Sequence, residues 1–173
     1  CMVFAEVTGS IQSNPNIPLS KRPKLEKDDL NKLISRINEI SKMMEDKGMP
    51  LAYHHHMGTV IESQKDTERL MENTIDSVKL LIDTGHMLFS GGDSLKILKD
   101  FHQKLIHVHT KDMRKEVLER SLKNDFSFQK SFLEGAFTVP GDGCIDYTPF
   151  IKKLKEISYS GWIVVEAEQD PSK

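Results

Sequence analysis

Short apolar runs alternate along the chain with segments whose apolar residues recur at helical spacing. The apolar runs predict five strands, at about residues 2–8, 50–56, 78–83, 105–109 and 161–168. Amphipathic helices are predicted at about residues 28–47, 64–73, 94–103 and 148–157, with one or two more in an insertion at 114–137. This alternation is typical of βα units. The sequence therefore predicts an α/β fold with parallel strands in chain order and helices on their outer face.

The polar ends of the predicted strands are spaced like the repeats of a TIM (β/α)8 barrel. Such a barrel has about 250 residues, or roughly 31 per unit. His54 and Asp83 are 29 residues apart, and Asp83 and His109 are 26 apart. Five strands cannot close an eight-stranded barrel. We therefore expect residues 1–173 to form a partial barrel, the C-terminal five βα units of a single TIM barrel domain.

Charge and composition restrict the class of partner. The chain has 24 Lys and Arg against 26 Asp and Glu, a net charge of -2, so no overall positive field attracts nucleic acid or anionic lipid. No apolar run approaches the roughly 20 residues needed to cross a bilayer. Two cysteines, Cys1 and Cys144, are too few for a disulfide scaffold. We expect a cytoplasmic protein that acts on a small neutral molecule and binds neither nucleic acid nor membrane.

Residues of the metal-binding type interrupt the apolar runs at the C-terminal ends of the last four strands. They are His54-His55-His56, Asp83, His107 with His109, and Glu166. Side chains at these strand ends converge on the rim where TIM barrels place their active sites. Mixed histidine and carboxylate ligands suit a divalent transition metal. We predict one such ion, with Mn²⁺ or Co²⁺ favoured and Zn²⁺, Fe²⁺ or Mg²⁺ as alternatives.

The histidine run and the aspartate each allow more than one interpretation. Strand alternation puts His54 and His56 on one face and His55 on the other. Either His54 or His56 is therefore a candidate metal ligand. Asp83 is a candidate ligand too, although aspartate at this place also commonly caps the following turn.

The last two strands leave a similar choice. His109 is the candidate ligand of its strand, but His107 lies on the same face and competes for the role. Glu166 and Glu168 also share a face, so one is expected to bind the metal and the other to lie at the rim. We take Glu166 as the ligand.

Four segments, in this order, resemble the xylose-isomerase-like barrel superfamily, which includes sugar epimerases, hydroxypyruvate isomerases and the repair endonuclease IV. They are Asp83-Thr84-Gly85-His86, His107-Val108-His109-Thr110-Lys111-Asp112, Gly141-Asp142-Gly143-Cys144-Ile145-Asp146 and Gly161-Trp162-Ile163-Val164-Val165-Glu166. The superfamily usually holds its metal with Glu, Asp, His and Glu. Asp83, His109 and Glu166 match the last three, whereas His54 stands where epimerases carry the first glutamate, with His56 one alternation further.

Within this superfamily, four segments resemble the inosose dehydratases. They are Phe4-Ala5-Glu6-Val7-Thr8-Gly9, Tyr53-His54-His55-His56-Met57-Gly58-Thr59, Thr138-Val139-Pro140-Gly141-Asp142-Gly143 and Glu166-Ala167-Glu168-Gln169-Asp170-Pro171. The resemblance implies a metal-dependent lyase of inositol catabolism that removes water from a cyclic polyol ketone, 2-keto-myo-inositol. An epimerase needs two carboxylates on opposite faces of its substrate, so a histidine at the first ligand position fits elimination better.

The general base stays open among Glu166, His86, Lys111 and Glu6. Two alternatives to the lyase remain. One is a sugar isomerase or epimerase of the same fold, and the other is a half-barrel without catalytic activity. Association into a homo-oligomer is also possible.

Overall fold

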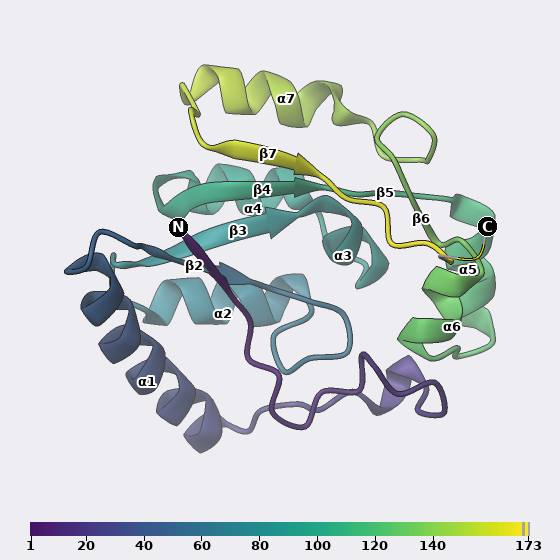
Figure 1. Ribbon diagram of the computed structural model, residues 1–173, viewed down its shortest axis with the longest axis horizontal. Coiled ribbons are helices and arrows are strands. Elements are labelled where there is room, and N and C mark those ends of the chain that lie inside the picture. The colour runs from purple at the N-terminus through teal and green to yellow at the C-terminus, as the bar shows by residue number, and fades with distance from the viewer. Residues whose placement is uncertain (171, 173) are drawn as a thin grey trace.

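The computed structural model describes residues 1–170 and 172, so Pro171 and Lys173 lie outside the described residues. Its centre is one curled sheet of five strands (Figure 1). In spatial order the strands are β1 (Met2–Phe4), β2 (Leu51–His54), β3 (Val78–Asp83), β4 (Leu105–Thr110) and β7 (Trp162–Val165). Every neighbouring pair is parallel. The predicted strand order and direction are confirmed, and the sheet forms part of a barrel.

The two outer strands are shorter than the sequence predicts. β1 ends at Phe4 rather than near Thr8, and β7 ends at Val165 rather than near Glu168. Each of them pairs with one neighbour only in this sheet, whereas β3 is hydrogen-bonded on both sides and buried along most of its length. An edge strand has half the ladder hydrogen bonds of a central one, so its ends are held less firmly in extended form.

Four helices cover the outer face of the sheet (Figure 1). They are α1 (Lys27–Glu45), α2 (Gln64–Asn73), α4 (Ser94–Phe101) and α7 (Tyr147–Glu156), close to the predicted ranges. Short 3-10 turns lie at Leu19–Lys21 (η1) and His102–Lys104 (η2). Apolar side chains such as Ile37, Leu70 and Ile97 pack between helices and sheet in one core. This outer layer leaves the strand ends free to carry chemistry.

One helix was not expected from the sequence. α3 (Thr84–Phe89) begins directly after β3, and the Asp83 side chain caps it by accepting a hydrogen bond from the His86 N–H at 2.9 Å. With six residues the helix is too short to show a periodic apolar face. The cap places Asp83 at the junction of strand and helix, at the C-terminal end of the sheet.

The insertion folds over the C-terminal ends of the strands. It consists of β5 (Asp112–Met113), α5 (Lys115–Lys123), α6 (Phe128–Leu133) and β6 (Phe137–Thr138), and β5 and β6 pair antiparallel. Of the one or two helices expected in this segment, the structure has two. The segment before α1 reaches the same end of the molecule, where the Leu19 N–H donates to the Phe126 carbonyl at 3.0 Å.

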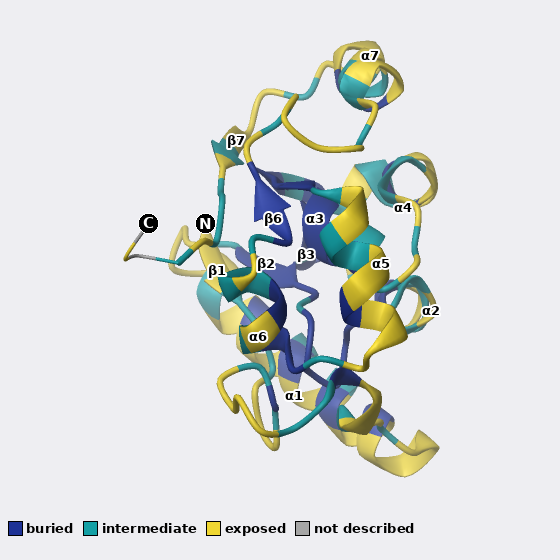
Figure 2. Cartoon of the chain, turned by 90° about the vertical axis from the view of Figure 1, so that its right-hand side faces the viewer, coloured by how far each residue is buried: buried dark blue, intermediate teal, exposed yellow. Residues whose placement is uncertain are grey.

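The partial barrel leaves apolar residues of its two outer strands in contact with solvent (Figure 2). On β7, Trp162 is 75% exposed and Val165 59% exposed, and on β1, Met2 is 46% exposed. The inner strands are almost entirely buried. Among the described residues there is no helix with the length and apolar character needed to cross a membrane.

Candidate metal centre

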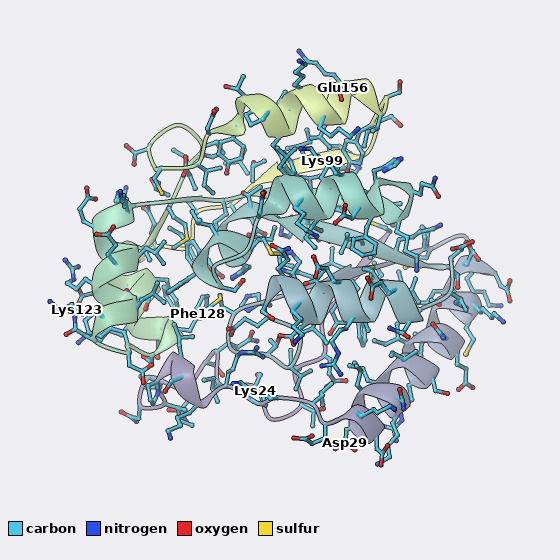
Figure 3. All side chains as sticks on the ribbon, turned by 180° about the vertical axis from the view of Figure 1, so that it is seen from behind. Lys24, Asp29, Lys99, Lys123, Phe128 and Glu156 are labelled. Carbon is cyan, nitrogen blue, oxygen red and sulfur yellow. The ribbon has the colours of Figure 1, made fainter. Side chains whose placement is uncertain are left out.

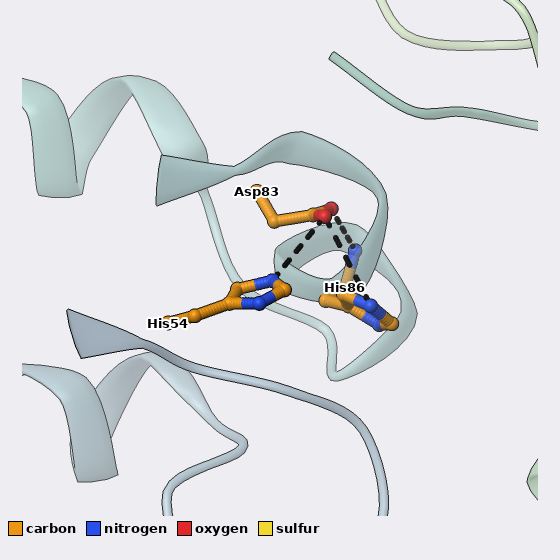
Figure 4. A group of neighbouring side chains, drawn as sticks. All are labelled: His54, Asp83 and His86. Carbon is orange, nitrogen blue, oxygen red and sulfur yellow. Dashed lines mark hydrogen bonds and ion pairs between the residues drawn. The ribbon is translucent and has the colours of Figure 1, made fainter. Parts of the chain in front are cut away.

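Three side chains meet because of how neighbouring strands are aligned. Asp83 of β3 pairs with His109 of β4, and His54 of β2 pairs with Leu81, two residues before Asp83. Since side chains alternate between faces with a period of two, His54, Asp83 and His109 all point to the same face. Asp83 Oδ2 lies 3.5 Å from His54 Nε2 and 3.6 Å from His109 Nδ1. Figure 4 shows the His54 ring facing the Asp83 carboxylate.

Glu166 completes this group from the edge strand. It follows β7 directly, and its N–H donates to the Thr110 carbonyl at 3.2 Å, which extends the pairing with β4 by one step. Its Oε2 lies 3.2 Å from His109 Nδ1. One ligand atom each from Asp83, His109 and Glu166 lie within 4.8 Å of one another. We call His54, Asp83, His109 and Glu166 the inner ligand set.

The inner ligand set fits a divalent ion. Among the described residues, His54 Nε2, Asp83 Oδ2 and His109 Nδ1 are buried without a hydrogen-bond partner. Buried polar atoms of this kind are unfavourable unless something pairs with them. Ligand atoms at 2.0–2.2 Å from a tetrahedral ion lie about 3.4 Å apart, and the separations given above are 3.2 to 3.6 Å. These three separations are therefore compatible with ligands of one tetrahedral ion.

The other histidines of the run occupy different surroundings. His55 is fully buried on the opposite face, and its Nε2 accepts a hydrogen bond from the Asp83 N–H at 3.3 Å. His56 lies beyond the end of β2, with its Nδ1 2.8 Å from the Met57 carbonyl oxygen. It groups with His86 and Glu168 instead of with the inner ligand set. Of the two histidines left open by the sequence, His54 is the one beside Asp83.

His107 and His109 share a face as expected, but only His109 belongs to the inner ligand set. The Nδ1 of His107 lies 3.8 Å from the Cys1 sulfur, nearer the start of the strands. Burial lowers the pKa of His107. Of the two histidines, His109 is therefore the one that lies beside Asp83 and Glu166.

Lys111 lies in the middle of the acidic groups. Its side chain is 1% exposed, and its Nζ lies 3.5 Å from Asp83 Oδ2, 3.1 Å from Glu166 Oε2 and 3.3 Å from Glu168 Oε2. The same Nζ is 3.2 Å from His86 Nε2. Burial alone lowers the pKa of the lysine, but the three carboxylates outweigh burial and raise it. The carboxylates therefore favour the charged form of Lys111.

The same charges determine the protonation of the ligands. Burial alone would raise the pKa of Asp83, but His86 and Lys111 outweigh it and hold the pKa well below its ordinary value. Contact with His109 lowers the pKa of Glu166 to about 2 against the effect of burial. Burial opposes charge on His109, yet the Asp83 and Glu166 carboxylates raise its pKa to about 9. Without a metal, His109 is thus a protonated imidazolium between two carboxylates.

The candidate base Glu6 is not brought to the centre. Its carboxylate accepts a hydrogen bond from the Thr8 N–H at 2.7 Å. It lines a cavity of about 310 Å³ beside α1, together with Phe4, Leu25 and Leu33. The other three candidate bases, Glu166, His86 and Lys111, are in contact with one another or with Asp83.

The comparisons with known proteins agree with this architecture. The family described as "Xylose isomerase-like TIM barrel" matches residues 1–173. The chain belongs to this family.

The inosose dehydratase of Clostridium beijerinckii is 43% identical over 173 residues, covering 99% of this chain and 58% of that protein. The "Rhizopine catabolism protein MocC" of Rhizobium meliloti is 40% identical over 172 residues, covering 99% and 53%. The chain thus spans a little more than half the length of these relatives.

Solved structures share the fold at lower identity. The "IOLI protein with a binding zinc atom" superimposes with a TM-score of 0.64 at 23% identity, covering 87% of this chain and 51% of that one. A "probable 3-DHS dehydratase AsbF" from Bacillus anthracis superimposes with a TM-score of 0.68 at 13% identity, covering 90% and 56%. These likenesses show the barrel fold, and the expected membership of the superfamily is confirmed.

The insertion supplies an aromatic wall that the sequence analysis did not assign to the site. The ring of Phe128 lies 5.4 Å from that of His56 and 5.7 Å from that of His86, and Phe137 lies 5.4 Å from His86. Figure 3 shows Phe128 toward the middle of the molecule and Lys123 of α5 at its outer edge. In the sequence, the only indication of this wall was the presence of phenylalanines in a segment with weak helical periodicity. The wall therefore covers the side of the centre on which His56 and His86 lie.

The glycine-rich turn that follows the insertion is anchored beside the centre. Asp112 accepts hydrogen bonds from the N–H groups of Gly141 at 3.0 Å and Ile145 at 2.9 Å. A Cβ at Gly143 would collide with the Asp112 carboxylate, so glycine is required there. Asp112 follows Lys111 directly, and the turn is therefore fixed to the same rim.

Proposed function

We propose that the protein is a metal-dependent dehydratase that removes water from a cyclic polyol ketone, with 2-keto-myo-inositol as substrate. The observation that carries the proposal is the position of Asp83, whose carboxylate is shared by two candidate metal groups, one with His54 and His86 and one with His109 and Glu166. Donor atoms of His54, Asp83 and His109 in these groups are buried and, among the described residues, have no hydrogen-bond partner. The names of the relatives support the substrate class, since several at 40 to 43% identity are inosose dehydratases. Within the same proposal, the inner ligand set binds the ion and Mn²⁺ or Co²⁺ is the native metal.

A bound divalent ion would polarise the substrate ketone and so acidify the neighbouring C–H. The chain must then supply a base for this proton and an acid for the departing hydroxyl. Lys111 is held in its charged form by three carboxylates, so it donates and does not accept a proton. Its position makes it the candidate acid for the leaving hydroxyl.

His86 and Glu166 are then the two remaining candidates for the base. His86 Nε2 faces the Lys111 ammonium at 3.2 Å and accepts its proton as a hydrogen bond. Since Nε2 of His86 accepts this hydrogen bond, the neutral ring is assigned the tautomer with its hydrogen on Nδ1. Nδ1 of His86 is then a hydrogen-bond donor. Glu166 is ionised and its side chain is 33% exposed, so a substrate can reach it. His86 is 0% exposed, so we assign the base to Glu166.

An epimerase is less well supported by the same arrangement. The imidazole of His54 stands beside Asp83 where epimerases carry a glutamate. A reaction that moves a proton from one face of the substrate to the other needs a base on each face. Elimination needs one base and one acid, which Glu166 and Lys111 can provide.

The test is an assay of the full-length protein after removal of metal with a chelator. Mn²⁺, Co²⁺, Zn²⁺ or Mg²⁺ is added back separately, and 2-keto-myo-inositol is followed by mass spectrometry for loss of one water. We expect no turnover without metal and recovery with Mn²⁺ or Co²⁺. Exchange of the α-proton for solvent deuterium without loss of water would favour the epimerase, and no turnover with any ion would overturn the proposal.

A further inference from the structure

The Lys111 ammonium lies beside two oxygen atoms that a bound ion would also need. Its Nζ approaches Asp83 Oδ2 at 3.5 Å and Glu166 Oε2 at 3.1 Å. The same two oxygen atoms face the ring nitrogens of His54 and His109. An ammonium and a divalent ion repel each other strongly at such separations, particularly in a buried site. Both cations therefore compete for the lone pairs of two shared oxygens.

Glu168 offers the ammonium another partner outside the inner ligand set. Its Oε2 lies 3.3 Å from Lys111 Nζ. Apart from this ion pair, the oxygen is buried and has no other partner among the described residues, so it can accept a hydrogen bond from the ammonium. Glu168 groups with His56 and His86, and not with Asp83 and His109. The ammonium can thus be held by Glu168 without occupying the oxygens of the metal ligands.

We propose that Lys111 is the internal counter-ion of the metal-free centre, and that Glu168 is the positioning residue that draws its ammonium away from Asp83 and Glu166 when a divalent ion binds. This inference rests on the proposed metal centre. With His109 neutral, as a metal ligand must be, the three carboxylates and the ammonium have a formal charge of -2, which one divalent ion cancels. The lysine therefore limits the cost of leaving the centre empty and weakens metal binding at the same time.

Tight packing around Lys111 allows only the end of its side chain to move. A Cβ at Gly85 would lie 2.8 Å from Lys111 Cγ and 2.8 Å from its carbonyl oxygen, so stem and backbone are packed tightly against α3. The Lys111 N–H also donates to Thr84 Oγ1 at 3.0 Å. Only the outer part of the side chain can change partner, and His86 Nε2 at 3.2 Å remains within its reach.

The test is a double-mutant cycle on metal affinity in the full-length protein. Lys111→Met, Glu168→Gln and the double variant are titrated with Mn²⁺ by calorimetry, and the absorption of bound Co²⁺ reports the coordination. We expect Lys111→Met to bind Mn²⁺ at least roughly tenfold more tightly, because it removes the competing ammonium, and Glu168→Gln roughly tenfold more weakly, because it leaves the ammonium on the oxygens of Asp83 and Glu166. The Glu168→Gln effect should vanish in the Lys111→Met background, because coupled residues are not additive.

A matched control is Glu119→Gln on α5, whose side chain is 66% exposed and pairs with Lys115. It should leave Mn²⁺ affinity unchanged, and circular dichroism identifies any variant that fails to fold. An equal effect of Glu168→Gln in both backgrounds would show that Glu168 acts on the ion directly and would overturn the inference, as would weaker binding by Lys111→Met. Absence of Mn²⁺ and Co²⁺ binding in the unaltered protein would instead refute the metal centre itself, and the inference with it.

Discussion

Gly85 offers the sharpest test of how closely the fold and the centre are linked. An added methyl group at this position would lie 2.8 Å from both the Cγ and the carbonyl oxygen of Lys111, whereas ordinary contact begins at 3.4 Å. Gly85→Ala therefore requires a displacement of about 0.6 Å, the difference between these two distances. The atoms that must give way are part of Lys111 itself, so the change reaches the centre without altering any candidate ligand.

The contacts around Lys111 determine how much Gly85→Ala destabilises the fold. Lys111 is 1% exposed, and Thr84 holds its backbone from both sides with hydrogen bonds of 3.0 Å to its N–H and its carbonyl. Overpacking at such a site destabilises a protein by about 1–3 kcal/mol. Replacing glycine by alanine within a helix such as α3 stabilises the helix by about 0.5–1 kcal/mol. We expect a net loss of about 1–2 kcal/mol and a change in Mn²⁺ affinity of several-fold.

Urea unfolding followed by circular dichroism measures the stability, and calorimetry measures the affinity. The control is Gly91→Ala, six positions further along the chain. Gly91 has a φ of +80° and no atom within 4 Å of an added Cβ. Alanine there should destabilise the fold by about 1–2 kcal/mol through backbone strain alone, with no effect on metal binding. Unchanged stability in Gly85→Ala, or a Mn²⁺ affinity equal to that of Gly91→Ala, would refute the reasoning.

Three further predictions concern the ligands and the sheet edges. Asp83→Asn should fold normally by circular dichroism, because its amide oxygen can still cap α3, but should lower Mn²⁺ affinity at least about 100-fold by calorimetry; a loss below about tenfold would argue against Asp83 as a ligand. The carboxylates that raise the pKa of His109 from 6.5 to about 9 stabilise the metal-free protein below pH 6.5, and this stability is lost as pH rises through 9. Mn²⁺ must displace the same proton, so titrations in two buffers should show proton release and an affinity that rises with pH up to about 9; an affinity independent of pH would contradict this. In a protein that consists of residues 1–173 alone, lysine at Trp162 and Val165 should reduce self-association through β7 in sedimentation experiments, and an unchanged distribution would show that this strand is not used.

The strand pattern alone was sufficient to predict the sheet and to place the candidate ligands at one end of it. Parallel strands joined by helices align their C-terminal ends, and alternation with a period of two assigns each side chain to a face. Asp83 and His109 meet for these reasons: Asp83 is the last residue of β3 and pairs with His109 of β4, beyond a register shift between Leu80 and Leu81. Glu166, one residue beyond its strand, continues the same pairing through its hydrogen bond to Thr110.

Residues beyond the strand ends needed the tertiary structure. β2 ends at His54, and the His56 N–H pairs with the Ile61 carbonyl in a turn, so alternation no longer predicts where His56 points. Glu6 likewise follows a strand that ends early, and it faces α1 instead of the centre. The path of a loop depends on the layers that pack against it. Local sequence periodicity does not predict which layers these are.

The central position of Lys111 was also decided by tertiary packing. Its contacts come from β3, α3 and the segment after β7, which are brought together only when the sheet curls. The wall formed by Phe128 comes from an insertion whose weak periodicity predicted helices but no direction. The sequence by itself thus determined which side chains are available at the rim. Their distances and charges depend on curvature and packing, which arise from contacts between residues far apart in the chain.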